Sequence, residues 1–85
     1  MISESVTVQI SSGLETRPIA MLVQVASSYE SKVYIEDSHM RINAKSIMGM
    51  MTIGLVPGRV ITVTAEGVDE EEAMAGVETF LREGA

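Results

Sequence analysis

The sequence predicts an α+β domain in which three helices cover one face of a four-stranded, mostly antiparallel sheet, in the order βαββαβα. Two observations lead to this prediction. Short stretches that alternate apolar and polar residues are typical of half-buried strands, and longer stretches with apolar residues every three or four positions are typical of helices. The chain has 85 residues, 46% of them hydrophobic, so one core and a single domain over residues 1–85 are expected.

The first strand and the first helix are predicted before residue 30. Residues 6–10 (VTVQI) alternate apolar and polar side chains, which predicts a strand. Apolar residues then recur at helical spacing over residues 17–29, and Pro18 fits this helix because it lies in the first turn. Either Glu15 or Thr16 would be the cap of this helix, and the pattern leaves the choice open.

A hairpin and a short helix follow. Residues 32–36 and 40–43 predict two short strands joined by a turn at residues 37–39. Ser46 is a residue type that commonly precedes the first turn of a helix, because its hydroxyl oxygen accepts a hydrogen bond from a free backbone N–H group. We therefore expect a helix that begins after Ser46 and ends near Ile53, before a glycine and a Pro-Gly pair.

The last strand and the last helix complete the predicted order. Residues 59–66 include the run VITVT, which is the strongest strand signal in the chain. Asp69 with Glu72 three residues later predicts a capping box at the start of a helix, and Gly84 marks its end. Its inward face would carry five apolar residues: Ala73, Met74, Val77, Phe80 and Leu81.

Composition excludes several classes of function. The chain has no cysteine, which excludes disulfides and thiolate metal sites, and its net charge of -6 argues against a nucleic-acid surface. No apolar run approaches the length of a membrane span, so we expect a cytoplasmic protein. The single histidine, His39, is expected in a solvated turn, and the acidic run at residues 69–72 suits a helix N-terminus. We expect no metal and no cofactor.

Two segments stand out at the predicted helix starts. The first reads Gly13-Leu14-Glu15-Thr16-Arg17-Pro18, and the second reads Asn43-Ala44-Lys45-Ser46-Ile47-Met48-Gly49. Together they resemble the two signature regions of HPr, the small phosphocarrier of the bacterial phosphoenolpyruvate-dependent sugar phosphotransferase system. The resemblance extends over essentially the whole chain, and it implies the HPr-like open-faced sandwich. In that family the first signature is close to Gly-[Ile/Leu]-His-Ala-Arg-Pro, and its histidine carries the phosphoryl group.

Glu15 occupies the position of that carrier histidine, so the chain resembles a variant without it and is expected not to be an enzyme or an ordinary phosphocarrier. Arg17 and Pro18 match the family signature, which keeps part of an anion site. Glu15 has two readings: a simple contribution to the helix cap, or an imitation of the charge of phosphohistidine. Thr16 as a new phosphate acceptor is a third and weaker reading.

Ser46 is the stronger candidate site. A serine at a helix start is ordinarily only a cap. The resemblance adds a second reading, because in HPr-like proteins the serine of Lys-Ser-Ile-Met-Gly is the target of HPr kinase/phosphorylase, and residues 45–49 keep that run. A phosphate at a helix N-terminus is favoured by the helix dipole, so the modification would change recognition and leave the fold intact.

A partner surface is predicted beside Ser46. If Ile47, Met50 and Ile53 face the core, Met48 and Met51 face outward and form an adaptable apolar patch; the alternative is a short helix buried on all sides. The candidate partner-binding residues are Leu14, Glu15, Thr16, Arg17, Ala20, Val23, Gln24, Ile47, Met48 and Met51.

The resemblance implies protein partners: HPr kinase/phosphorylase, the catabolite control regulator, and also Enzyme I or the Enzyme IIA proteins. The leading hypothesis is a regulatory adaptor in carbon catabolite control, switched at Ser46. The alternatives are an atypical phosphocarrier that accepts phosphate from Enzyme I on another residue, and a binding module without control at Ser46.

Overall fold

The computed structural model describes residues 1–9, 16–38, 40–54 and 56–84, and for Thr16 and Arg17 it describes the backbone alone. The element order is the predicted one, βαββαβα. The elements are β1 Ile2–Thr7, α1 Thr16–Ser27, β2 Lys32–Asp37, β3 Met40–Asn43, α2 Ile47–Ile53, β4 Val60–Glu66 and α3 Glu70–Glu83. The α+β fold class and the positions of the last six elements are thus confirmed, with boundary differences of one or two residues.

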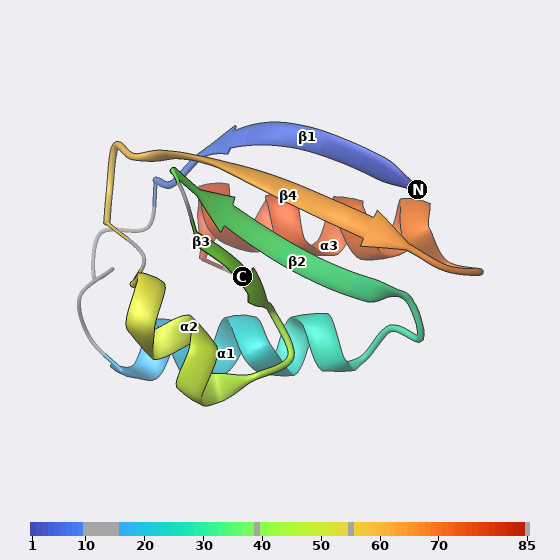
Figure 1. The fold of residues 1–85 in the computed structure, drawn as a ribbon, viewed down its shortest axis with the longest axis horizontal. Coiled ribbons are helices and arrows are strands. Elements are labelled where there is room, and N and C mark those ends of the chain that lie inside the picture. The colour runs from blue at the N-terminus through green and yellow to red at the C-terminus, as the bar shows by residue number, and fades with distance from the viewer. Residues whose placement is uncertain (10–15, 39, 55, 85) are drawn as a thin grey trace.

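The four strands form one sheet in the order β1-β4-β2-β3. Every neighbouring pair in this order is antiparallel. The helices α1 and α3 lie behind the sheet in Figure 1, and α2 packs against α1 and β3 at one end of the molecule. The β2–β3 hairpin is closed by the pair Asp37 and Met40, with Ser38 at a positive φ of 56° in the turn. Both predicted layers are therefore present.

The core lies between the sheet and the two long helices. All five residues predicted to form the inward face of α3 are buried. On α1, Ile19, Leu22 and Ala26 are buried at the helical spacing seen in the sequence. Val33 and Ile35 point into the same core from β2. The apolar residues that alternate along the strands and those that recur at helical spacing therefore pack into one common core.

The first strand differs from its prediction: β1 spans Ile2–Thr7, not residues 6–10. Thr7 pairs with Val60, the first residue of β4, so the ladder ends there. Val8 remains buried, but its N–H donates to the carbonyl of Arg59 at 2.9 Å in the turn before β4. The strand begins earlier than its apolar run because hydrogen bonding to β4 continues through polar residues near the N-terminus.

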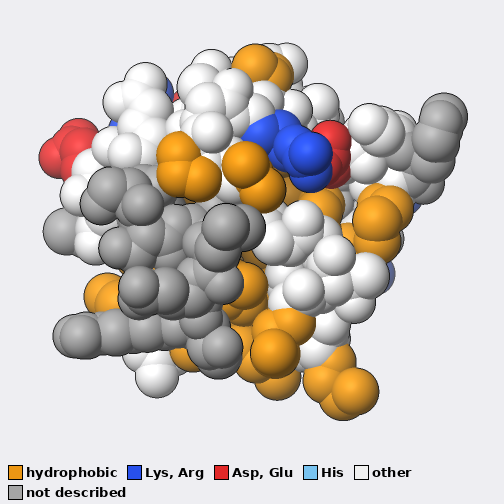
Figure 2. All heavy atoms as spheres, turned by 90° about the vertical axis from the view of Figure 1, so that its left-hand side faces the viewer, with side chains coloured by type: hydrophobic (Ala, Val, Ile, Leu, Met, Phe, Trp, Pro, Cys, Tyr) orange, Lys and Arg blue, Asp and Glu red, His pale blue; other side chains and the backbone are white. Residues whose placement is uncertain are grey.

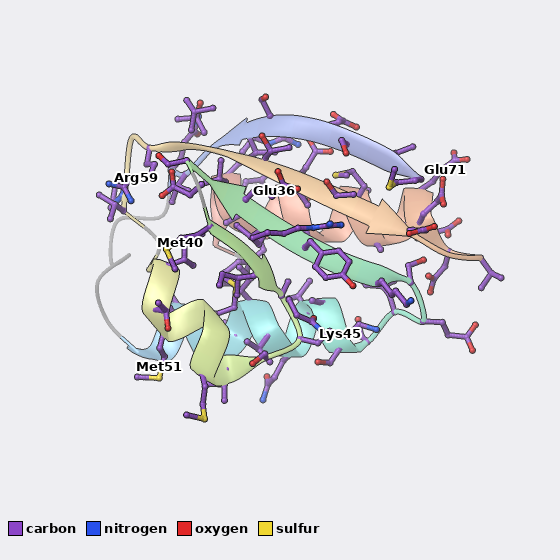
Figure 3. The ribbon with its side chains drawn as sticks, in the orientation of Figure 1. Glu36, Met40, Lys45, Met51, Arg59 and Glu71 are labelled. Carbon is purple, nitrogen blue, oxygen red and sulfur yellow. The ribbon has the colours of Figure 1, made fainter. Side chains whose placement is uncertain are left out.

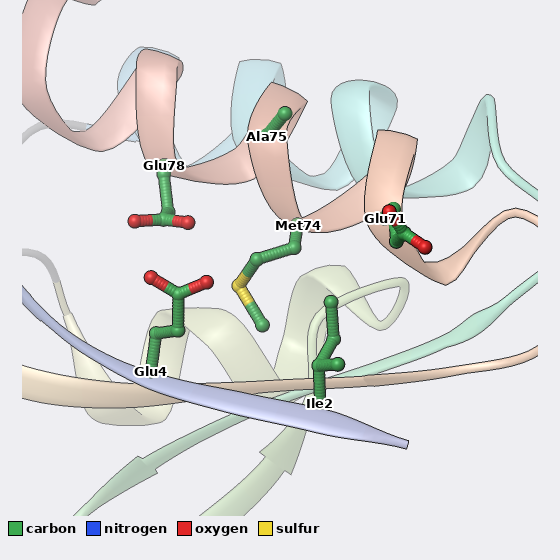
Figure 4. A pocket seen from close by; sticks show the side chains of 6 residues that line it. All are labelled: Ile2, Glu4, Glu71, Met74, Ala75 and Glu78. Atoms are coloured by element: carbon green, nitrogen blue, oxygen red, sulfur yellow. The ribbon is translucent and has the colours of Figure 1, made fainter.

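Glu4 interrupts the pattern of apolar residues that would have predicted the start of this strand. It lies on the helix-facing side of β1, and its carboxylate faces that of Glu78 on α3 (Figure 4). Burial raises the pKa of the Glu78 carboxyl, the negative charge of Glu4 raises that pKa further, and Arg82, 3.8 Å from Glu78, opposes the rise. Two like charges thus meet at the edge of the core.

Replacing Glu4 with glutamine is expected to stabilise the protein at pH 7 by about 0.5 kcal/mol, because one of the two like charges is removed. The folded pKa of Glu78 is raised, so its contribution to stability is present below the ordinary glutamate pKa and is lost as the pH rises through the folded value. Urea unfolding between pH 4 and pH 7 should show a smaller loss of stability with rising pH in Glu4→Gln. The control is Glu72→Gln, which makes the same change in net charge at an exposed position of α3 that does not line the pocket between Glu4 and Glu78. Equal effects of the two variants would contradict this account.

The start of α3 is held differently from the prediction of a capping box. Asp69 occupies the N-cap position, but its side chain makes no cap hydrogen bond. Its carboxylate instead accepts hydrogen bonds from the N–H groups of Glu30 (2.9 Å) and Ser31 (2.8 Å) and from the hydroxyl of Ser31. The Ser31 hydroxyl and then the Glu30 N–H lower the pKa of Asp69. Glu72 plays no part in this arrangement, which joins the α1–β2 turn to α3.

Candidate functional site

Ser46 lies exposed at the N-terminus of α2, as predicted. Its backbone is extended, with φ -102° and ψ 112°, and its hydroxyl oxygen accepts a hydrogen bond from the N–H of Gly49 at 3.2 Å. The carbonyl of Ser46 accepts the first helical bond, from the N–H of Met50 at 2.9 Å. These bonds satisfy backbone groups that a helix start otherwise leaves free. The cap role of Ser46 is confirmed, and its hydroxyl is accessible from solvent.

The residues around Ser46 fix where this helix starts. The side-chain oxygen of Asn43 accepts a hydrogen bond from the N–H of Lys45 at 2.9 Å, which shapes the turn after β3. The ammonium group of Lys45 donates to the carbonyl of Tyr29 at 2.7 Å and ties this turn to the segment after α1. A Cβ at Gly49 would lie 2.7 Å from Ile42, so only glycine allows α2 to approach β3 this closely. Neither the role of Asn43 nor that of the Lys45 side chain was predicted; the available signal was an asparagine directly before the turn that follows β3.

The short helix α2 has one buried face and one exposed face. Met50 is fully buried and Ile53 nearly so, as predicted. Met48 is 80% exposed and Met51 is 53% exposed, so both point outward, and Figure 3 shows the Met51 side chain directed away from the sheet. The reading in which this helix is buried on all sides is therefore wrong.

Ile47 was considered both as a core-facing residue and as a partner-binding residue; the core-facing assumption is wrong, because Ile47 is 38% exposed, and its role in binding stays a prediction. A helix has 3.6 residues per turn, so the residues that contact the core or β3 (Gly49, Met50 and Ile53) share one face. Ile47 falls outside that face, on the side of Met51 four residues later. We call the exposed trio Ile47, Met48 and Met51 the α2 apolar patch.

The first helix supplies further candidate residues beside α2, with which it is in contact. Gln24 is exposed, whereas Ala20 and Val23 are partly buried, and Val23 packs against the core. Figure 2 shows hydrophobic side chains at the surface on the side of the molecule that carries α2 and the start of α1. Ser46, the α2 apolar patch and Gln24 are thus exposed on two helices that are in contact. Ala20 and Val23 are partly buried, so less of their surface is available to a partner.

The side chains of four further candidates, Leu14, Glu15, Thr16 and Arg17, lie outside the part of the chain that the structure describes. Leu14 and Glu15 lie outside the described residues, and so does His39. Thr16 and Arg17 form the first two positions of α1 in the described backbone, and Pro18 is buried in the same turn. The predicted start of this helix near the signature segment is confirmed, while the choice between Glu15 and Thr16 as its cap stays open.

Within residues 1–9, 16–38, 40–54 and 56–84, no three His, Cys, Asp or Glu side chains are grouped so that they could hold a metal ion. None of the helices in the described ranges has the length and apolar character needed to cross a bilayer.

Comparisons with known proteins agree with the fold and with the resemblance to the HPr family. A family model described as "PTS HPr component phosphorylation site" matches residues 2–83. The HPr-like protein Crh of Halalkalibacterium halodurans is 41% identical over 81 residues, which cover 95% of this chain and 96% of that protein.

Solved structures give the same result. Phosphocarrier protein HPr from Bacillus anthracis superposes with a TM-score of 0.90 at 38% identity, covering 94% of this chain and 95% of that one. Crh, the catabolite repression protein of Bacillus subtilis, superposes with a TM-score of 0.77 at 37% identity, covering 98% of this chain and 95% of that one. A family match over nearly every residue, together with relatives above 30% identity, leads to one conclusion: this chain belongs to the HPr family.

Proposed function

We propose that this protein is a regulatory adaptor of the sugar phosphotransferase system that acts in carbon catabolite control and is switched by phosphorylation of Ser46. The observation that carries the proposal is the position of the Ser46 hydroxyl, exposed at a helix N-terminus beside the α2 apolar patch. The similarity to Crh, which is described as a catabolite repression protein in Bacillus subtilis, supports the same role. Glu15 stands in the place of the carrier histidine, which fits a protein that partner proteins bind and that transfers no phosphoryl group.

Phosphorylation at Ser46 fits the physical environment. A phosphate adds about -1.5 to -2 charge and three acceptor oxygens. The free N–H groups and the positive end of the dipole at the start of α2 favour negative charge, and the Gly49 N–H already points at the Ser46 oxygen. Ser46 is exposed, so the added group displaces no core side chain. The modified chain keeps its fold and gains a surface anion that an arginine or lysine of a partner can bind.

The partners that this role requires would use one surface. HPr kinase/phosphorylase must reach Ser46, and the catabolite control regulator reads the phosphoserine together with the apolar side chains beside it. The contact surface would combine the α2 apolar patch with Gln24 and with the signature residues at the start of α1. Enzyme I and the Enzyme IIA proteins would approach the same side of the molecule. All of these are protein partners, in the cytoplasm, and none requires a nucleic acid or a membrane.

Incubation with HPr kinase/phosphorylase and ATP tests the switch. We expect one phosphoryl group on Ser46, located by mass spectrometry of its peptide, and tighter binding of the catabolite control regulator afterwards. The Ser46→Asn variant is the matched control, because asparagine caps helices as well as serine but offers no hydroxyl. Ser46→Ala loses the cap as well, at a cost of about 1 kcal/mol in folding stability. Absence of label on a folded wild-type protein would leave Ser46 as a cap only.

A second incubation, with Enzyme I and labelled phosphoenolpyruvate, tests the alternative of an atypical phosphocarrier. We expect no label, because the acceptor position carries a carboxylate. Label that passes onward to an Enzyme IIA protein would overturn the adaptor proposal and would point to Thr16 or His39 as the acceptor.

A further inference from the structure

Two exposed methionines lie close together in the α2 apolar patch. The chain has seven methionines, and two of them lie in this patch on adjacent turns of α2: Met48, which is 80% exposed, and Met51, which is 53% exposed. Between them Met50 is fully buried, and Met74 on α3 is 2% exposed. The structure therefore offers accessible and protected thioethers within a few residues of one another, which gives any reaction at sulfur an internal control.

Peroxide reacts with a thioether that it can reach. The sulfur lone pair attacks one oxygen of hydrogen peroxide, an S–O bond forms and the O–O bond breaks, and the second oxygen leaves as water after taking up a proton. The sulfur is oxidised by two electrons and the peroxide is reduced. The product, methionine sulfoxide, is polar, and methionine sulfoxide reductases return it to the thioether.

The thioether and the sulfoxide differ most in the free energy of burying the methionine side chain against a partner. On the free protein, an S=O group on Met48 or Met51 stays in water, because both side chains are exposed, and Figure 3 shows that of Met51 directed away from the sheet. The oxidised chain should therefore keep its fold. In a docked complex the same oxygen would be buried among apolar atoms without a donor, and an unsatisfied buried acceptor is costly.

We propose that Met48 and Met51 form a reversible oxidation site that closes the docking surface beside Ser46 when peroxide is present. This inference rests on the proposed function, because it assumes that the α2 apolar patch is where the kinase and the regulator dock. The adaptor then has two independent inputs on one helix: phosphate at the cap promotes recognition, and sulfoxide on the exposed face prevents it. Docking requires a reduced patch.

The test begins with mild hydrogen peroxide treatment of the folded full-length protein, followed by peptide mass spectrometry. Met48 should be oxidised before Met51, with the exposed Met1 also reacting early, while Met50 and Met74 stay reduced and the circular dichroism spectrum is unchanged. Binding to HPr kinase/phosphorylase should fall at least about ten-fold, which corresponds to about 1.4 kcal/mol. Treatment with methionine sulfoxide reductases A and B should restore it.

Two variants make the result specific. Met48→Leu/Met51→Leu keeps an apolar surface without sulfur, so this protein should bind the kinase before and after peroxide equally well. Met21→Leu removes a partly exposed methionine of α1 and should remain as sensitive as the wild type. Equal binding of oxidised and reduced wild type would overturn the oxidation site alone. Oxidation of Met50 before Met48 would also overturn it. Failure of the reduced protein to bind the kinase at all would overturn both this inference and the proposed function.

Discussion

Replacing Met48 with aspartate is expected to weaken binding to HPr kinase/phosphorylase by about 100-fold while leaving the fold unchanged. Exposed methionines on a short helix give a partner an apolar, adaptable contact, and a carboxylate in the same place must lose its water on docking. Replacing an anchor residue near the centre of an interface commonly costs about 2–4 kcal/mol, and the expected 100-fold loss corresponds to about 2.8 kcal/mol. Titration calorimetry with the kinase would measure the effect.

The matched control for Met48→Asp is Val68→Asp, which adds the same charge at an apolar side chain that is 87% exposed before α3. Val68→Asp should leave kinase binding unchanged, and both variants should unfold within about 0.5 kcal/mol of the wild type, as exposed substitutions commonly do. A large loss of stability in Met48→Asp would place this side chain among packed neighbours. Unaltered binding would remove it from the docking surface.

Replacing Gly67 with alanine is expected to lower the free energy of unfolding by about 3 kcal/mol or more. The φ of Gly67 is +155°, which L side chains rarely adopt, and a Cβ there would lie 2.7 Å from Cα of Ser31. Ser31 cannot withdraw easily, because the Asp69 carboxylate holds both its N–H and its hydroxyl. Thermal unfolding should show a midpoint lower by about 10 °C or more.

Gly58→Ala separates backbone strain from the steric contact. Gly58 has a φ of +89°, but a Cβ at this position would meet no atom of the described residues within 4 Å. Its substitution should cost only the strain of a left-handed residue, about 1–2 kcal/mol. If Gly58→Ala and Gly67→Ala lose equal stability, the close approach of Gly67 to Ser31 has no energetic importance.

The regular part of this fold can be predicted from the sequence because its signals are local. The inward face of α3 and the apolar spacing of α1 follow directly from helical periodicity, and the β2–β3 hairpin follows from two short strands separated by turn residues. Ser46 could be assigned as a cap for the same reason, since a cap depends on residues within one turn of the helix.

The features that escaped prediction depend on partners far away in the sequence. The carboxylate of Asp69 binds Ser31, which is 38 residues away and has no local signature. The strand β1 was placed too late because Glu4 lies at a core-facing position, where an apolar residue is expected, and faces Glu78 on a helix at the other end of the chain. Ile47 was assumed to face the core and was also predicted to bind a partner, because seven helical residues carry too few apolar positions to fix which side is buried.

The small size of α2 has a consequence for how this protein could serve several clients. Its seven residues carry Met48 and Met51 a single turn apart, and Ser46 directly precedes the first of those turns. A typical interface covers about 800 Å² of each protein, and a footprint of that size centred on Met48 would include the whole outer side of this helix. Kinase and regulator would then exclude one another. The kinase and the regulator would compete for a single binding surface on α2. The cellular response would then depend on how abundant this protein is relative to the proteins that bind it.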